Sequence, residues 1–216
     1  MSIVCYVLRA PSAVIAQVRA DHDLLAGVTQ HASQSIWNAH FEATLKRLAP
    51  EEAATMRKER DDAMKKMRAM PDLAAEFERL AAAQKRAAAL NVAEALCLDK
   101  QWHILHFALT GSSGLTGEPA DALMSGEEVG ADAGYGPPRV HDPDAARAFA
   151  DFLAAQDFAA LLARAGPDAM KEARLYGAPG AIDELLATML SDDFVRLRDY
   201  TAHARDRGEG MITWLA

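Results

Sequence analysis

Hydrophobic residues recur along most of the chain at three- and four-residue intervals, the spacing of one face of an α-helix. Two segments near the two ends of the sequence differ, because β-branched and aromatic residues follow one another there. They are IVCYVL at 3–8 and MITWLA at 211–216, and such residues favour strands. Since a single strand leaves backbone groups without partners, we expect both segments to join one small antiparallel sheet.

The helical spacing predicts helices over 13–20, 35–48, 50–70, 72–90, 92–98, 100–109, 143–155, 157–165, 167–176 and 180–208. Residues with capping chemistry support several boundaries. Asp142 precedes the helix at 143–155 as an N-cap, and Gly111 follows the helix at 100–109. Asn91 and Glu94 have the spacing of a capping box for 92–98, and Asp99 is expected to cap the next helix.

A long segment rich in glycine, residues 111–139, separates the helix at 100–109 from the helix at 143–155. Long loops inside compact domains are usually functional or mobile. The whole pattern predicts a mostly helical α+β fold, a single domain over 1–216 with a small antiparallel sheet that contains both terminal strands. A helical hairpin inserted at about 36–90 completes the prediction.

Composition narrows the classes of function. The chain has 216 residues, half of them hydrophobic, and a formal net charge of −8. This acidic balance argues against nucleic acid as the main partner. No apolar run reaches the ~20 residues that a membrane-spanning helix needs, so no membrane is expected. The first ten residues lack a basic start and a long apolar stretch, and we expect a cytoplasmic protein with Cys5 and Cys97 as free thiols.

The segment 50–90 is rich in alanine, methionine and charge. One interpretation is a pair of solvated helices held by salt bridges. The other is an arm that binds a protein partner through Met56, Met64, Met67 and Met70, since flexible methionine side chains adapt to varied surfaces. Alanine-rich helices need packing to be stable, which keeps the second interpretation open.

The stretch LCLDKQWHILHFALTG at 96–111 carries candidate chemistry. Trp102 and His106 share one helical face with two leucines, and His103 lies at the edge of that face. Histidines in such a position are usually bonded to backbone or carboxylate groups. A ligand-binding role is the alternative, because histidine titrates near neutral pH. A metal site is not expected, since zinc needs three or four ligands and this stretch offers an incomplete set.

The segment GYGPPR at 134–139 forms a second candidate. Two glycines and two prolines fix the backbone around Tyr135 and ahead of Arg139. Arg139 therefore leaves a rigid anchor, and its guanidinium suits either an acidic residue of the same domain or the carboxylate or phosphate of a ligand. Trp102, His103, His106, Tyr135 and Arg139 together are the predicted candidate pocket.

Motifs of the common enzyme classes are missing from the sequence. No GxGxxG follows a strand, and neither a GxxxxGK[ST] loop nor a GxSxG nucleophile elbow occurs. The sequence thus assigns no catalytic residue, no metal and no cofactor, and it favours a protein without enzymatic activity.

Three stretches resemble the YfbM-like bacterial proteins, the family described as domain of unknown function 1877. They are CLDKQWHILHFALTG, then GYGPPRVHDPDAARAFADFL, and the ending GEGMITWLA after a long helix. The short N-terminal strand with Tyr6 also resembles the opening of the family. The resemblance covers roughly 1–30 and 91–216, and the helices at 36–90 stand apart from it. It implies an α+β fold in a bacterial cytoplasmic protein, and it implies no reaction.

Two hypotheses of function follow. The first is a non-catalytic protein-binding or accessory module, which could neutralise a toxin, since an acidic surface complements a basic partner. The second is an enzyme or receptor for a small anionic ligand that uses the His/Tyr/Arg pocket. They differ in geometry, because the second requires His106 and Arg139 to meet in one accessible cleft.

Overall fold

The computed structural model describes residues 3–132, 134–177 and 181–216. It contains two compact units. The first unit consists of Met1–Ala20 with Asn91–Ala216, and the second is Asp21–Leu90. The family resemblance of the sequence places an insertion at about 36–90, whereas the second unit begins at Asp21. The interpretation as one domain with an insertion stays a prediction.

A five-stranded antiparallel sheet forms the centre of the first unit, in the order β2-β1-β5-β4-β3. β1 (Cys5–Ala10) pairs with β5 (Gly210–Leu215) along its whole length, from Cys5 opposite Leu215 to Ala10 opposite Gly210. β4 (Arg139–His141) continues the sheet beside β5, and β3 (Glu127–Glu128) lies at that edge. The predicted pairing of the two terminal strands in one sheet is confirmed, and so is the α+β class.

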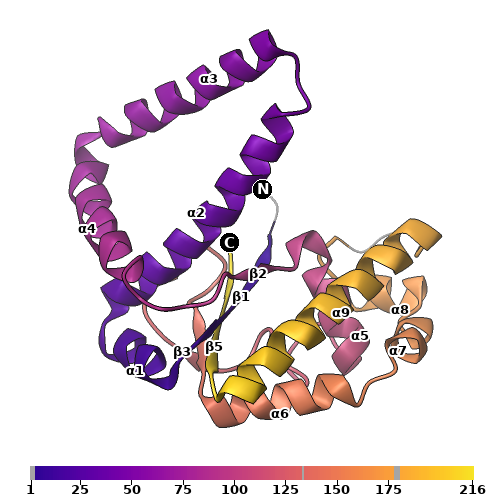
Figure 1. Cartoon of the computed structure of the whole chain (residues 1–216). Coiled ribbons are helices and arrows are strands. Elements are labelled where there is room, and N and C mark those ends of the chain that lie inside the picture. The colour runs from indigo at the N-terminus through magenta and orange to yellow at the C-terminus, as the bar shows by residue number, and fades with distance from the viewer. Residues whose placement is uncertain (1–2, 133, 178–180) are drawn as a thin grey trace. The chain divides into compact units, whose positions relative to one another are not determined.

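Helices lie against the sheet and beyond it in this unit (Figure 1). They are α1 (Ser12–Ala20), α5 (Trp102–Thr110), α6 (Pro143–Ala154), α7 (Phe158–Arg164), α8 (Pro167–Glu172) and α9 (Glu184–Arg207), with the 3-10 turn η1 (Asp99–Gln101) before α5. α6 and α9 pack against each other and against the central strands. Their apolar faces join Cys5 and Val7 of β1 in one core. The predicted face of α1, with Val14, Ile15 and Val18, is buried.

The predicted ends of several helices agree with the structure. Asp142 accepts a hydrogen bond from the backbone N–H of Ala145 at 2.9 Å and so caps α6. Gly111 and Gly208 end α5 and α9 in the left-handed conformation, with φ of 74° and 63°. A side chain on these residues would be strained, which explains why glycine stands there.

The prediction of a helix at 92–98 is wrong. Leu96–Cys97 instead form the short strand β2, in which Cys97 lies opposite Tyr6 of β1. The exposed backbone of a sheet edge recruits this segment, so tertiary pairing overrides local helix propensity. The N-cap role predicted for Asp99 is also wrong, because α5 begins after η1 and no side chain caps it.

The two cysteines are free thiols, as predicted. Cys5 is completely buried and Cys97 is half-buried. Burial raises the pKa of both thiols, and it is the largest cause in each case. A thiol with a raised pKa is a poor nucleophile, so neither cysteine has the properties of a reactive site.

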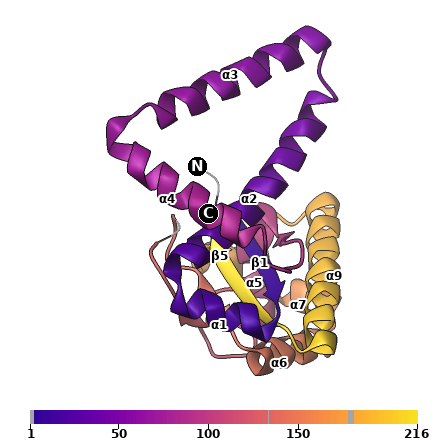
Figure 2. The same cartoon turned by 60° about the vertical axis from the view of Figure 1, so that its left-hand side comes forward.

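Three helices make up the second unit: α2 (His22–Leu45), α3 (Pro50–Arg68) and α4 (Pro71–Ala87). The helices predicted at 50–70 and 72–90 correspond to α3 and α4. α4 packs along α2, however, and meets α3 mainly where the two helices join (Figure 2). Gly27 of α2 permits the close packing, because a Cβ atom there would lie 2.5 Å from the carbonyl oxygen of Ala83.

α3 differs from every other long helix of the chain, because none of its residues is buried. Two of its arginines contact α2 within the unit. Arg57 forms an ion pair with Glu42 at 2.7 Å, and the Arg60 guanidinium lies 4.3 Å from the centre of the Phe41 ring. Charges fit the helix dipole, since Glu51 and Glu52 are in its first turn and basic residues are in its last.

Candidate functional site

Trp102 begins α5 and belongs to the buried core, with 3% of its surface exposed. Its indole Nε1–H donates to the carbonyl of Ile3 at 3.2 Å. Its ring also stacks on His103, with 4.7 Å between the ring centres and 14° between the planes. The indole N–H thus has a hydrogen-bond partner and the ring face is packed, as expected for a tryptophan in the core.

His103 uses both of its ring nitrogens in hydrogen bonds to the backbone. Nδ1 accepts from the N–H of Tyr176 at 2.9 Å, and Nε2 lies 3.0 Å from the carbonyl oxygen of Ser113. Because Nδ1 accepts, the proton of the neutral ring must be on Nε2, which donates to Ser113. The ring therefore connects α5 with two segments that are distant in sequence.

His106 lies one turn further along α5 and is completely buried. Its Nε2 lies 3.2 Å from the carbonyl oxygen of Gly114, and its Nδ1 has no partner among the described residues. Burial lowers the pKa of His106, while the bond to Gly114 and the nearby Asp121 oppose that shift. The neutral ring is the stable form at this site, because charging it would require hydration that the core does not provide.

The loop that these two histidines contact is folded around Asp121, which is 1% exposed. The carboxylate of Asp121 accepts from the backbone N–H groups of Thr116 and Gly117, and from the hydroxyl of Thr116 at 2.9 Å. A buried carboxylate is stable when several donors surround it in this way. We call residues 111–126 the histidine-clamped loop.

His141 of β4 contacts the same loop from the sheet. A Cβ atom on Gly126 would lie 2.8 Å from the His141 ring, so only glycine permits this close approach. Burial lowers the pKa of His141, and Glu118, whose carboxylate is 4.0 Å from Nδ1, opposes the shift. Its Nε2 is buried and has no partner in the described part of the chain. Three histidines thus hold one loop.

Arg139 and Tyr135 have different surroundings. Arg139 lies opposite Glu128 in the register of β3 and β4, and its guanidinium donates to that carboxylate at 3.0 Å. The Asp132 carboxylate accepts hydrogen bonds from the N–H groups of Gly134 and Gly136, at 2.6 and 2.9 Å. These two bonds fold the loop that precedes Arg139. The Tyr135 side chain is 38% exposed.

The structure therefore brings together three of the five candidate residues. Along α5 the ring of His103 stacks on Trp102 and lies 6.3 Å, centre to centre, from the ring of His106. Arg139 is paired across two strands with a carboxylate of its own unit. A ligand site built from all five residues stays a prediction.

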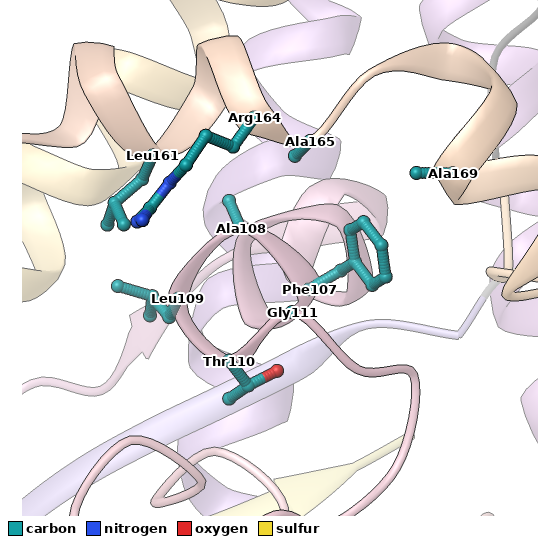
Figure 3. A pocket seen from close by; sticks show the side chains of 9 residues that line it. All are labelled: Phe107, Ala108, Leu109, Thr110, Gly111, Leu161, Arg164, Ala165 and Ala169. Carbon is teal, nitrogen blue, oxygen red and sulfur yellow. The ribbon is translucent and has the colours of Figure 1, made fainter.

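A pocket of about 390 Å³ lies on another surface of α5 (Figure 3). It is lined by the last turn of α5, by α7 and by the start of α8, and none of the five predicted site residues contributes to it. Sequence reasoning missed its residues Phe107, Leu161 and Arg164, because they follow the ordinary helical pattern and form no motif. His141 was also missed, and its place directly after Val140 in a short strand is the signal that could have found it.

Two searches of the described residues bear on metal and membrane binding. Within residues 3–132, 134–177 and 181–216, no group of three or more His, Cys, Asp or Glu side chains is arranged to hold a metal ion. No helix of these segments has the length and apolar character required to cross a membrane.

The fold and its loop define an α+β protein in which both terminal strands are central in one antiparallel sheet. The chain belongs to the family described as "Domain of unknown function (DUF1877)", whose family model matches residues 41–214. The resemblance found in the sequence is confirmed. The match includes α3 and α4, which lie in the segment 36–90 that the resemblance seen in the sequence did not cover.

A solved structure shares the fold. The crystal structure of YfbM from Escherichia coli, a protein of unknown function, is 17% identical in sequence and has a TM-score of 0.55. The alignment covers 99% of this chain and 99% of YfbM. The search of curated proteins found no match.

Proposed function

We propose that this chain is a non-catalytic protein-binding module, and that a protein partner binds along α3. The observation that carries the proposal is the exposure of α3, which is 19 residues long and buries none of them. In proteins, helices owe most of their stability to packing of one face against other groups. A partner that covered α3 would supply the packing that the second unit leaves out.

The methionines of α3 support a protein as the partner. Met56 is 36% exposed and Met67 is 44% exposed, and Met70, which follows the helix, is 52% exposed. Within α3, Met56, Ala63 and Met67 recur at intervals of seven and four residues, the spacing of the contact positions between paired helices, and Met70 follows three residues later. We call these four residues the methionine stripe. Its residue types suit adaptable contacts with an apolar helix or groove.

The charges of α3 favour a specific partner rather than nonspecific adhesion. Acidic and basic residues surround the methionine stripe and nearly balance each other. Such a rim lets a complementary surface bind and rejects others, because a like charge placed opposite costs free energy. A cytoplasmic location and an accessory role fit this proposal.

The test is co-purification of the full-length chain from its native host, with two sets of variants. Met56→Glu combined with Met67→Glu places two charges in the methionine stripe. Leu185→Glu on α9 is the matched control, because Leu185 is 70% exposed and lies in the other unit. We expect a stoichiometric partner with the wild type and with the control, and its loss in the double variant. Equal recovery in all three proteins would contradict the proposal.

A further inference from the structure

The pocket beside the last turn of α5 has the size and walls of a small-molecule site. Its volume of about 390 Å³ lies in the range of such sites, roughly 300–1,000 Å³. Phe107 and Leu161 provide apolar walls and are each at most 7% exposed. Ala108, Ala165 and Ala169 also line it, and their short side chains leave the space open. Figure 3 shows their methyl groups and the Phe107 ring around the pocket.

One end of the pocket is cationic. Arg164, the last residue of α7, runs beside Leu161 with its guanidinium toward Leu109 (Figure 3). It is exposed at the surface and forms no ion pair within the described ranges of the chain. A free guanidinium presents a planar set of donors that matches a carboxylate. The pocket therefore combines an apolar wall with a group that recognises an anion.

The other polar feature has the opposite sign. α5 ends beside this pocket. There the N–H of Gly111 donates to the carbonyl oxygen of Phe107 at 2.7 Å and closes the helix. The carbonyl groups that follow Phe107 in this last turn lack partners inside the helix and carry partial negative charge. An ammonium group is favoured at such a helix end. An anion without a positive group would be repelled by it.

From these three features we infer that the pocket binds an apolar α-amino acid in its zwitterionic form. The carboxylate would pair with Arg164, the ammonium group would lie against the C-terminal turn of α5, and the apolar side chain would contact Phe107 and Leu161. This inference is independent of the proposed partner on α3, because every residue of the pocket lies in the first unit.

Isothermal titration of the full chain with three matched probes tests the inference. The probes are L-leucine, L-leucinamide, which lacks the carboxylate, and 4-methylpentanoate, which lacks the ammonium group. We expect one leucine to bind per chain. Each of the two analogues should bind at least about tenfold more weakly than leucine, because each loses one charged contact. No detectable leucine binding, or equal binding of leucine and 4-methylpentanoate, would overturn the inference.

Variants assign the binding to this pocket. Arg164→Gln should weaken leucine binding by about tenfold while leaving leucinamide binding unchanged, because only leucine offers a carboxylate. Ala169→Leu fills the pocket from its half-buried wall and should abolish binding of all three probes. Arg207→Gln at the end of α9 is the matched control. Circular dichroism of each variant confirms folding, and leucine binding retained in both Arg164→Gln and Ala169→Leu would also overturn the inference.

Discussion

Acid should destabilise this protein through the two buried histidines that hold the histidine-clamped loop. Burial lowers the pKa of His106 and of His141 in the folded state, so both rings stay neutral there. In the unfolded chain each returns to the ordinary value of 6.5. Below that pH the unfolded state binds more protons than the folded state. The stability that the two neutral histidines contribute is therefore fully present above pH 6.5, and it is lost as the pH falls toward their pKa values in the folded state.

The magnitude follows from proton linkage. One such histidine contributes at most about 1.4 kcal/mol per pH unit to the slope of the unfolding free energy. The two together contribute at most about 2–3 kcal/mol over one pH unit below 6. Asp121 beside His106 and Glu118 beside His141 oppose the shifts, so the full slope is an upper limit. A loss of this size is a large share of a typical domain's 5–15 kcal/mol.

Urea denaturation followed by tryptophan fluorescence between pH 8 and pH 5.5 measures this slope. The variants are His106→Gln, His141→Gln and their combination. Glutamine cannot titrate in this range, and at position 106 its amide can still donate to Gly114. His203→Gln, at an exposed position of α9, is the control. We expect a flatter pH dependence in the double variant and an unchanged one in the control. Identical slopes in the wild type and the double variant would refute the reasoning.

Three further substitutions have expected effects on stability. Trp102→Ala should cost about 3–5 kcal/mol in chemical denaturation, because it removes a buried ring and leaves the Ile3 carbonyl unpaired; an unchanged midpoint would show that the ring is not packed. Arg139→Lys should cost under about 1 kcal/mol, since Glu128 is well exposed; phosphate should leave the melting temperatures of both proteins alike, and a phosphate effect limited to the wild type would favour a ligand role. Replacing glycine by alanine inside a helix usually stabilises the helix by about 1 kcal/mol. In Gly27→Ala, however, the added methyl group would collide with Ala83, so we expect a lower melting temperature by circular dichroism. A higher melting temperature would show that α2 and α4 separate easily.

The sequence was sufficient to predict the sheet and most helices, because their signals are local. Val7 and Ile212 belong to runs of strand-forming residues, and Asp142 has a side chain that caps a helix. β2 could not be predicted in this way. Its two residues form a strand only because the edge of β1 offers hydrogen bonds, and that edge exists only in the folded chain.

The candidate site was predictable to a smaller extent. Bonding of His103 and His106 to backbone groups was one of the two alternatives stated from the sequence, and both bonds are present. Which carbonyls accept them depends on how the histidine-clamped loop folds, and no spacing rule contains that information. Arg164 is a candidate only because α5, α7 and α8 together line a pocket, and contacts between helices leave no motif in the sequence.

The most direct test of the proposed function is photocrosslinking along α3 in living cells of the native host. A photoreactive amino acid replaces Met67 in one variant and Leu185 in another, and both positions are exposed. The account predicts one discrete crosslinked protein from position 67, with none of the same mass from position 185. The absence of an adduct at position 67, or the same adducts at both positions, would contradict it.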